Sequence, residues 1–428
     1  MNQISLPSMN NPKMSYNKPL QVFEYQKLRY TDANSFTQKQ FEALVQFNED
    51  NDSKYFSIIH KGIQFGSYVG VIQIGGLTIE ILPKADKERN STQEEKETWQ
   101  SVLLHMLKIC KKIQVENVSE TQLKKKYNSI LEAYFAMYLE EIDHLIKRGL
   151  IKKYRRKQSN QLALKGKLIF SENIQKNMIH KERFYCEHSV YDKDHLIHQI
   201  LLKGLEVLES LETSNYKDKI KRLQFNFDDV KNLKVTAKHF ETLKLNRKSK
   251  PYDRAVSIAK MLILNYSPNI NSGQDNMLTL LFDMNKLWEE YIFRILHKNK
   301  PNGYEVSFQN SDYFWENKSV RPDIVVTIDK TENIIIDTKW KIVDSNNPSD
   351  NDLKQMFVYN LHWDSTRSIL LYPKTNQNDS EFGNYHYKHI EDNFNQCKLG
   401  FVSVLKDGKL KDDKILSDEI FKKLKAYD

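Results

Sequence analysis

Two aspartates and a lysine in the last third of the chain have types and spacing that suit metal-assisted hydrolysis. Asp323, Asp337 and Lys339 form the pattern D-x13-D-x-K. Carboxylate oxygens are the ligands that Mg²⁺ and Mn²⁺ prefer, and a bound divalent cation lowers the pKa of water and neutralises charge on an attacked phosphodiester. A lysine beside it positions or helps deprotonate the water, or stabilises the pentavalent charge. We therefore predict all three residues as catalytic, with the aspartates as metal ligands.

Two predicted β-strands would bring these residues together. Pro322 has a fixed φ and no N–H, so it suits the first residue of a strand and places Asp323 at that strand's beginning. A polar turn at 329–333 returns the chain along an apolar strand that ends near Asp337. Because side chains alternate along a strand, Asp337 and Lys339 project to one face and the residue between them to the other. Antiparallel pairing would then let the carboxylates share one cation.

The same residues permit a structural interpretation. In it, Asp323 lies next to a turn, and Asp337 and Lys339 form an ion pair at a strand end. The pattern alone arises often by chance. An Arg-Pro pair before the first aspartate and three isoleucines before the second favour the catalytic interpretation.

Three more residues are candidates for the same site. An apolar stripe at helical spacing predicts a helix from Thr279 to Lys298, and Glu289 lies beside this stripe. Gln355 and Tyr359 are four residues apart on a helix predicted from Asp352 to His362, so their side chains face the same way. The ordinary alternatives are a solvated glutamate, and a surface glutamine beside a core tyrosine.

Basic residues are in excess, with a net charge of +9 and a pI near 9.0. Lysines and arginines that neutralise phosphates release counterions, so this excess favours an anionic partner. From His144 to Phe170 there are nine Lys or Arg and no Asp or Glu. A solvated face or a subunit contact would also produce such a cluster. The residues that we predict to contact nucleic acid are Lys152, Lys153, Arg155, Arg156 and Lys157.

The 428 residues are too many for one ordinary core and predict an α+β multidomain protein. Alternating runs at Tyr68–Ile74 and Leu77–Leu82 across Gly75-Gly76 predict a hairpin. The predicted parts are a disordered tail at 1–20, a β-rich module at 21–85, a mainly helical middle at 86–270 with a short β segment near 161–170, and an α/β core with a mixed sheet at 271–428.

Other classes of protein are disfavoured. Three widely separated cysteines do not suit a disulfide framework, and no run approaches the ~18 apolar residues of a membrane span, so we expect no membrane partner and a cytoplasmic protein. No nucleotide-binding P-loop is present. The residues Cys186, His188, His195 and His198 have zinc-ligand types, but helix-surface histidines are the commoner explanation and no second cysteine is near.

These motifs resemble two nested groups of proteins. The D-x13-D-x-K pattern after Arg-Pro resembles the PD-(D/E)XK nuclease superfamily, and Gln355 with Tyr359 resembles an extra motif of its RecB-like members. The whole chain resembles the McrC family, the nuclease subunits of McrBC modification-dependent restriction systems and their LlaJI-type relatives. The matching stretches are Gly70–Ile74, Ile79–Lys84, Leu164–Leu168, Phe282–Glu289, Arg321–Ile324, Asp337–Lys341 and Asp352–Tyr359.

The resemblance implies a Mg²⁺- or Mn²⁺-dependent DNA endonuclease subunit with a PD-(D/E)XK core. It implies that Glu289 is a further metal ligand and that Gln355 and Tyr359 approach the metal and the DNA. It also implies a partner, an McrB-like AAA+ GTPase hexamer that recognises modified cytosine and that the N-terminal part of this chain stimulates. The hairpin from Gly70 to Leu82 is our candidate for the element that contacts this hexamer.

Two other functions stay open. A non-catalytic adaptor would bind DNA or a motor protein and keep the nuclease fold as a scaffold. A stand-alone repair nuclease would need no motor. The presence of Asp323, Asp337 and Lys339 disfavours the first, and the 270 residues that precede the predicted core disfavour the second.

Overall fold

The computed structural model describes residues 19–32, 34–84, 92–113, 129–211, 216–267, 276–343, 347–375, 377–386 and 395–425. The tail predicted for residues 1–20 lies outside these residues except at its end, where the first strand begins at Leu20. The domain boundary predicted at 271 also lies outside them.

The N-terminal region combines two sheets and one helix. One sheet has the strand order β1-β6-β5-β11-β10, and a smaller one has the order β2-β4-β3. Apolar side chains of both sheets and of the helix share one core. The elements are β1 (Leu20–Phe23), β2 (Lys27–Arg29), α1 (Gln38–Glu49), β3 (Phe56–Ile59), β4 (Gly62–Phe65), β5 (Tyr68–Ile74) and β6 (Leu77–Leu82).

Strands β5 and β6 form the predicted hairpin, with Ile74 paired to Leu77 and Gly75 at a left-handed φ of 52°. Gly70 has a φ of +134°, and a Cβ there would lie 2.0 Å from the Leu280 carbonyl oxygen of β11. Both hairpin strands are buried along most of their length in the middle of the sheet. Neighbouring strands and packed helices cover most of the hairpin and leave the turn at Gly76 exposed, so its contact with a partner stays a prediction.

Strand β11 (Met277–Asp283) comes from far along the chain and pairs antiparallel with β5, and the short β10 (Tyr266–Ser267) pairs with β11. The sequence predicted a helix from Thr279 here. The helix α10 (Met284–Asn299) instead begins after Asp283, whose side chain accepts from the backbone of its first turn. A short apolar run does not distinguish a buried strand from a helix. The segment after residue 276 thus completes the N-terminal sheet before it enters the C-terminal region.

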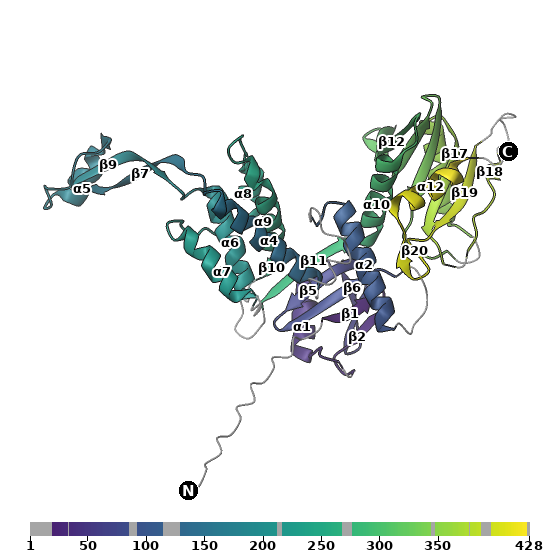
Figure 1. The fold of residues 1–428 in the computed structure, drawn as a ribbon, viewed down its shortest axis with the longest axis horizontal. Helices are drawn as coiled ribbons and strands as arrows, with labels where there is room; N and C mark the ends of the chain where they lie inside the picture. The colour runs from purple at the N-terminus through teal and green to yellow at the C-terminus, as the bar shows by residue number, and fades with distance from the viewer. Residues whose placement is uncertain are drawn as a thin grey trace, which may run out of the picture.

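The middle of the chain is a group of helices from which a long β arm projects (Figure 1). The predicted short β segment at 161–170 instead belongs to an arm built on two nine-residue strands. The first of them, Lys153–Gln161, has no buried residue and no alternating apolar pattern. No helix in the described residues could cross a membrane. The helices are α2 (Gln93–Ile109), α4 (Ile130–Lys147), α6 (Leu196–Ser210), α7 (Lys217–Gln224), α8 (Ala237–Thr242) and α9 (Asp253–Leu264), and the arm contains β7 (Lys153–Gln161), β8 (Lys167–Leu168), α5 (Phe170–Asn177) and β9 (Phe184–Asp192).

The C-terminal region contains a mixed sheet of order β12-β15-β16-β17-β19-β18. Strands β16, β17 and β19 are parallel, and the other pairings are antiparallel. The elements are β12 (Tyr304–Phe308), β13 (Asp312–Trp315), β14 (Lys318–Val320), β15 (Ile324–Ile328), β16 (Glu332–Thr338), α11 (Asp350–His362), β17 (Ser365–Pro373), β18 (Gly383–Asn384), β19 (Gln396–Val402), β20 (Leu405–Lys406), β21 (Lys409–Leu410) and α12 (Asp413–Leu424).

Helices cover both faces of this sheet. Ile334 and Ile336 of β16 belong to the core that includes α10 and α12, whereas Ile335 belongs to a separate core with α11. This division follows from the alternation of side chains along β16. The face under α11 is the one that matters for the candidate site.

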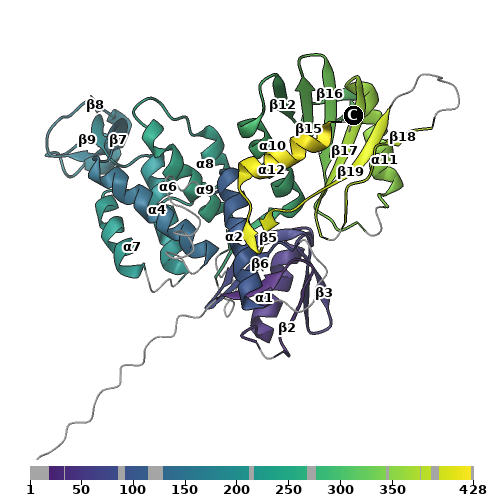
Figure 2. The same cartoon turned by 45° about the vertical axis from the view of Figure 1, so that its right-hand side comes forward.

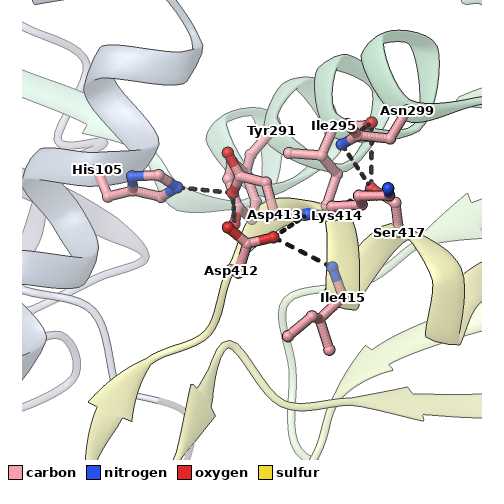
Figure 3. A network of polar contacts seen from close by, with 9 residues as sticks. All are labelled: His105, Tyr291, Ile295, Asn299, Asp412, Asp413, Lys414, Ile415 and Ser417. Carbon is pink, nitrogen blue, oxygen red and sulfur yellow. Dashed lines mark hydrogen bonds and ion pairs between the residues drawn. The ribbon is translucent and has the colours of Figure 1, made fainter.

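Helix α2 connects the N-terminal and C-terminal regions, since it packs against both β6 and α10 (Figure 2). His105 of α2 lies 2.7 Å from Asp413 Oδ1 at the start of α12, and the Tyr291 hydroxyl of α10 donates to the same oxygen at 3.0 Å (Figure 3). Burial opposes ionisation of Asp413, but the contacts with His105 and Tyr291 leave its pKa below the usual value. Three helices from distant parts of the sequence thus meet at one carboxylate.

Candidate active site

The register of β15 and β16 places the two predicted aspartates opposite each other. Ile324 pairs with Ile336 in antiparallel register, so Asp323, one residue earlier, lies across from Asp337, one residue later. Asp337 shares the face of Ile335, which α11 covers. The predicted pairing of these two strands is confirmed.

Asp323 is held by the residue that separates Asp337 from Lys339. The Thr338 backbone N–H donates to Asp323 Oδ2 at 2.7 Å, and the Thr338 hydroxyl donates to the same oxygen at 3.0 Å. Strand alternation gave Thr338 no role in the sequence prediction. The backbone N–H of a strand residue points in the plane of the sheet toward the neighbouring strand, and this direction brings it to Asp323.

The Lys339 ammonium lies between the aspartates and helix α11. Its Nζ is 2.6 Å from Asp337 Oδ2 and donates to Gln355 Oε1 at 3.3 Å. Gln355 Nε2 donates to the Tyr359 hydroxyl at 2.7 Å, and that hydroxyl donates to the Arg321 carbonyl oxygen at 2.9 Å. The structure therefore brings Gln355 and Tyr359 to the site, and their chain of hydrogen bonds orients the lysine.

Both aspartates are difficult to ionise in this environment. Burial, and then the nearby Glu289 carboxylate, raise the pKa of Asp323 to about 6. Burial and the charge of Asp323 raise the pKa of Asp337 to about 7, although Lys339 acts in the opposite direction. Burial disfavours the charged form of Lys339, yet its contact with Asp337 leaves the pKa of the ammonium above its usual value. The site has more buried negative charge than one ammonium neutralises.

The two aspartates fit a magnesium ion, which commonly uses one or two carboxylates and keeps several water ligands. Asp337 Oδ2 is buried and has no hydrogen-bond partner among the described residues, so only the ion pair with Lys339 compensates it. A buried carboxylate oxygen that is compensated by an ion pair alone is suited to a cation. No group of three or more His, Cys, Asp or Glu side chains in the described residues is arranged to hold a metal ion.

Glu289 therefore does not complete a three-carboxylate site with Asp323 and Asp337 in this arrangement. It is half-buried on α10, and its Oε1 accepts a hydrogen bond from Gln309 Nε2 at 2.6 Å. Its charge still acts on Asp323, which shows that it lies within electrostatic reach. The contact with Gln309 of the β12 end holds Glu289 beside the aspartates rather than among them.

The predicted nucleic-acid residues lie far from this site, on or next to β7 of the arm (Figure 1). The sequence showed no acid within the cluster, but β9 brings acids to it from the next strand. Arg155 forms an ion pair with Asp192 at 2.8 Å and with Asp194 at 3.1 Å. Arg156 lies 3.5 Å from Glu187 but is largely exposed. The exposed basic residues are Lys152, Arg156 and Lys157.

The zinc alternative has no support among the described residues. His198 Nδ1 lies 2.8 Å from the Lys193 carbonyl oxygen, and burial lowers the pKa of this histidine to about 3. The rings of His195 and His198 pack against each other at a tilt of 32°, with centroids 4.1 Å apart. His198 is fully buried and His195 half-buried, so the helix-surface explanation is wrong for His198, which is a packed core histidine.

The sequence did not reveal the ion pair that joins the segment after β16 to helix α11. Lys341 Nζ donates to Asp352 Oδ2 at 2.5 Å. Burial disfavours the ionised form of Asp352, but this hydrogen bond leaves its pKa below the usual value. The opposite charges of Lys341 and Asp352, which flank the start of the predicted helix, were the one signal in the sequence.

Comparison with known proteins identifies the family. A family model described as "McrBC 5-methylcytosine restriction system component" matches residues 63–373. The chain belongs to this McrBC family. The matched range contains every residue of the candidate active site, so the McrBC assignment covers the site as well as most of the fold.

Two solved structures resemble this McrBC-family chain. One is a half-complex of Thermococcus gammatolerans McrB AAA+ hexamers with bound McrC, with a TM-score of 0.70, 19% identity, and coverage of 94% of this chain and 99% of that chain. The other is a cryo-EM structure of the Thermococcus gammatolerans McrBC complex, with a TM-score of 0.47, 19% identity, and coverage of 66% and 88%. At this identity the first likeness shows the fold. No curated protein matches the sequence.

Proposed function

We propose that this chain is the DNA-cleaving subunit of a 5-methylcytosine-type restriction complex, a Mg²⁺-dependent endonuclease with a PD-(D/E)XK site. The observation that supports this most is the convergence of Asp323, Asp337 and Lys339 at one strand end, with the pKa of both carboxyls raised. A structural ion pair needs one carboxylate for one ammonium, and a second buried carboxylate destabilises it. A divalent cation would remove this repulsion.

Each residue has a distinct role in this proposal. Asp323 and Asp337 would hold Mg²⁺ or Mn²⁺, and the bound cation lowers the pKa of water and offsets charge on the phosphate. Lys339 remains protonated at neutral pH because its pKa is raised, so it acts as a hydrogen-bond donor to the water or the phosphate rather than as a base. Gln355 and Tyr359 hold that ammonium in place.

Glu289 would act on the same ion through a water molecule instead of binding it directly. Its carboxylate is near enough to raise the pKa of Asp323 but is not grouped with both aspartates. Magnesium keeps several water ligands, and a nearby carboxylate can accept hydrogen bonds from these waters.

We propose that the partner is an McrB-like AAA+ GTPase hexamer, because the Thermococcus gammatolerans structure contains McrC bound to McrB AAA+ hexamers. The β arm is the better candidate for the contact than the buried β5–β6 hairpin. It projects from the body (Figure 1). It also carries many exposed apolar side chains, and such a surface is typical of a protein–protein contact. These residues are Tyr154, Leu162, Leu164, Phe170, Ile174, Met178, Ile179 and Tyr191.

Ile179→Asp tests the arm, since Ile179 is 88% exposed and its replacement does not disturb a core. We expect this variant to lose stimulation of the partner's GTP hydrolysis while its thermal unfolding is unchanged. Ile415→Asp is the matched control, because Ile415 is 49% exposed at the start of α12, where an acid is favourable. Equal stimulation by the two variants would exclude the arm as the contact.

Asp337→Asn tests the catalytic proposal in the full chain co-purified with an McrB-like partner. We expect DNA cleavage in Mg²⁺ to fall by about 10³-fold or more while GTPase stimulation persists. The control is Asp364→Asn, an exposed aspartate whose left-handed φ of 47° asparagine adopts readily. If wild type and Asp337→Asn were both inactive on DNA but stimulated the partner, the adaptor would be correct. Cleavage without any partner would favour the stand-alone nuclease.

A further inference from the structure

The residue directly after the catalytic lysine is bonded to the N-terminal region. Trp340 is 3% exposed, and its indole Nε1 donates to Glu24 Oε1 at 2.6 Å, across 316 residues of sequence. The same oxygen accepts the backbone N–H of Lys84 at 2.9 Å. Glu24 follows β1 and its own N–H donates to the Leu82 carbonyl oxygen at the end of β6, so two strands of the N-terminal sheet hold it.

Aromatic packing restricts Trp340 from two further directions. Its ring lies 5.1 Å from that of Trp288 on α10 and 6.5 Å from that of Trp99 on α2, measured between centroids. The packed rings restrict the orientation of the Trp340 indole, and the hydrogen bond to the Glu24 carboxylate fixes the direction of its N–H. These contacts hold the backbone of Trp340. The neighbouring Lys339 N–H donates to the Leu371 carbonyl oxygen at 2.9 Å and holds the backbone on the other side.

A carboxylate at position 24 carries a desolvation penalty because it is buried. Glu24 is 5% exposed, and its Oε2 is buried with no hydrogen-bond partner among the described residues. Burial raises its pKa to about 7, although the bonds from Lys84 and Trp340 act in the opposite direction. A neutral side chain could accept from the indole at lower cost. A charged acceptor makes a stronger, shorter hydrogen bond, which is useful where orientation matters.

We propose that Glu24 is a positioning residue for the hydrolytic site: through Trp340 it fixes the end of strand β16, so that the Lys339 ammonium remains on Asp337. This inference rests on the proposed function. It means that the N-terminal sheet supplies part of the geometry of a site more than three hundred residues away. A change in the position of the N-terminal region relative to the C-terminal region would then displace Lys339 through the Trp340 indole.

The test compares Glu24→Ala and Glu24→Gln in the full chain co-purified with its partner. We expect Glu24→Ala to lower kcat for DNA cleavage about tenfold with KM within about twofold, because a displaced lysine affects the reacting state more than substrate binding. Glu24→Gln keeps an acceptor oxygen and should recover most of the loss. Glu80→Gln is the matched control, since Glu80 is a buried carboxylate of the same sheet that accepts from Gln21, Gln100 and Ile130 and contacts no site residue.

Glu80→Gln should lower the temperature of unfolding without lowering kcat. Wild-type kcat in Glu24→Ala, or an equal loss of kcat in Glu80→Gln, would overturn the positioning role. Failure of the proposed nuclease function can be told apart from failure of the positioning role, because wild type and Asp337→Asn would then have the same activity on DNA. In that case a ¹³C-detected pH titration of the Asp337 carboxyl still tests the positioning role. Glu24→Ala should loosen the contact of Lys339 with Asp337 and so raise the pKa of Asp337 above its wild-type value. An unchanged pKa would contradict the proposal.

Discussion

Thr338 donates two hydrogen bonds to one oxygen of Asp323, one from its amide at 2.7 Å and one from its hydroxyl at 3.0 Å. The residue between the second aspartate and the lysine is therefore a clamp on the first aspartate. It ties the end of β16 to the beginning of β15 at the point where the two carboxylates face each other. Any residue except proline can donate the backbone hydrogen bond there, whereas the hydroxyl hydrogen bond needs Thr or Ser.

Thr338→Val removes the hydroxyl and keeps the shape and the amide. We expect kcat for DNA cleavage to fall about fivefold to tenfold, because Asp323 then retains one of its two fixed hydrogen bonds. Thr338→Ser retains the hydroxyl and should stay within about twofold of wild type. Steady-state cleavage of a modified duplex measures both, and a wild-type rate in Thr338→Val would show that the clamp does not matter.

Metal affinity should depend on pH because protons and cations compete for the aspartates. The pKa of Asp323 is raised to about 6 and that of Asp337 to about 7, and only the ionised forms bind a cation. Calorimetric titration with Mn²⁺ in the absence of DNA should therefore show weaker binding at acidic than at alkaline pH. Addition of EDTA should abolish cleavage, and Mg²⁺ should restore it. Affinity that does not vary with pH would mean that neither carboxyl is a ligand.

Without metal, the raised pKa of Asp337 also makes stability depend on pH. The folded state holds the proton more tightly than the unfolded state, so this stabilising contribution is complete below the usual carboxyl pKa and is lost as pH rises through about 7. Asp337→Asn is uncharged throughout this range. In EDTA, the unfolding free energy of the variant relative to wild type should thus increase between acidic and alkaline pH, by about 1–3 kcal/mol. Thermal unfolding across the pH series measures this, and parallel curves would contradict it.

Tyr359→Phe removes the hydroxyl that joins Gln355 to the Arg321 carbonyl oxygen. Gln355 then loses its orientation, and with it the hydrogen bond to Lys339, so we expect kcat to fall about tenfold. Tyr385→Phe is the control, because that hydroxyl donates to the Leu353 carbonyl oxygen on the same helix, away from the lysine. Similar activities of the two variants would show that the hydrogen-bond chain only stabilises α11.

Local patterns predicted the part of the site that lies on neighbouring segments. The strands that carry Asp323 and Asp337 are joined by a short turn, so their pairing followed from alternation and turn residues. Helical spacing put Gln355 and Tyr359 on one face of the next helix, and only the resemblance to RecB-like nucleases implied that they approach the site. The mixed sheet was expected from the order of helices and strands.

Contacts between distant segments could not be predicted from local sequence patterns. Strand β11 pairs with β5 about two hundred residues earlier, and its apolar run suits a helix equally well. The bond between Glu24 and Trp340 has no local pattern at all. Strand β7 of the arm is largely polar on both faces, so the periodicity that identifies a half-buried strand is missing there.

The position of a bound metal tests the central claim most directly. Crystals of the chain soaked with Mn²⁺ should give one anomalous peak between Asp323 and Asp337, at about 2.1 Å from an oxygen of each. The peak should be absent in crystals of Asp337→Asn. A Mn²⁺ peak elsewhere, or none at these aspartates in a preparation that cleaves DNA, would contradict the account.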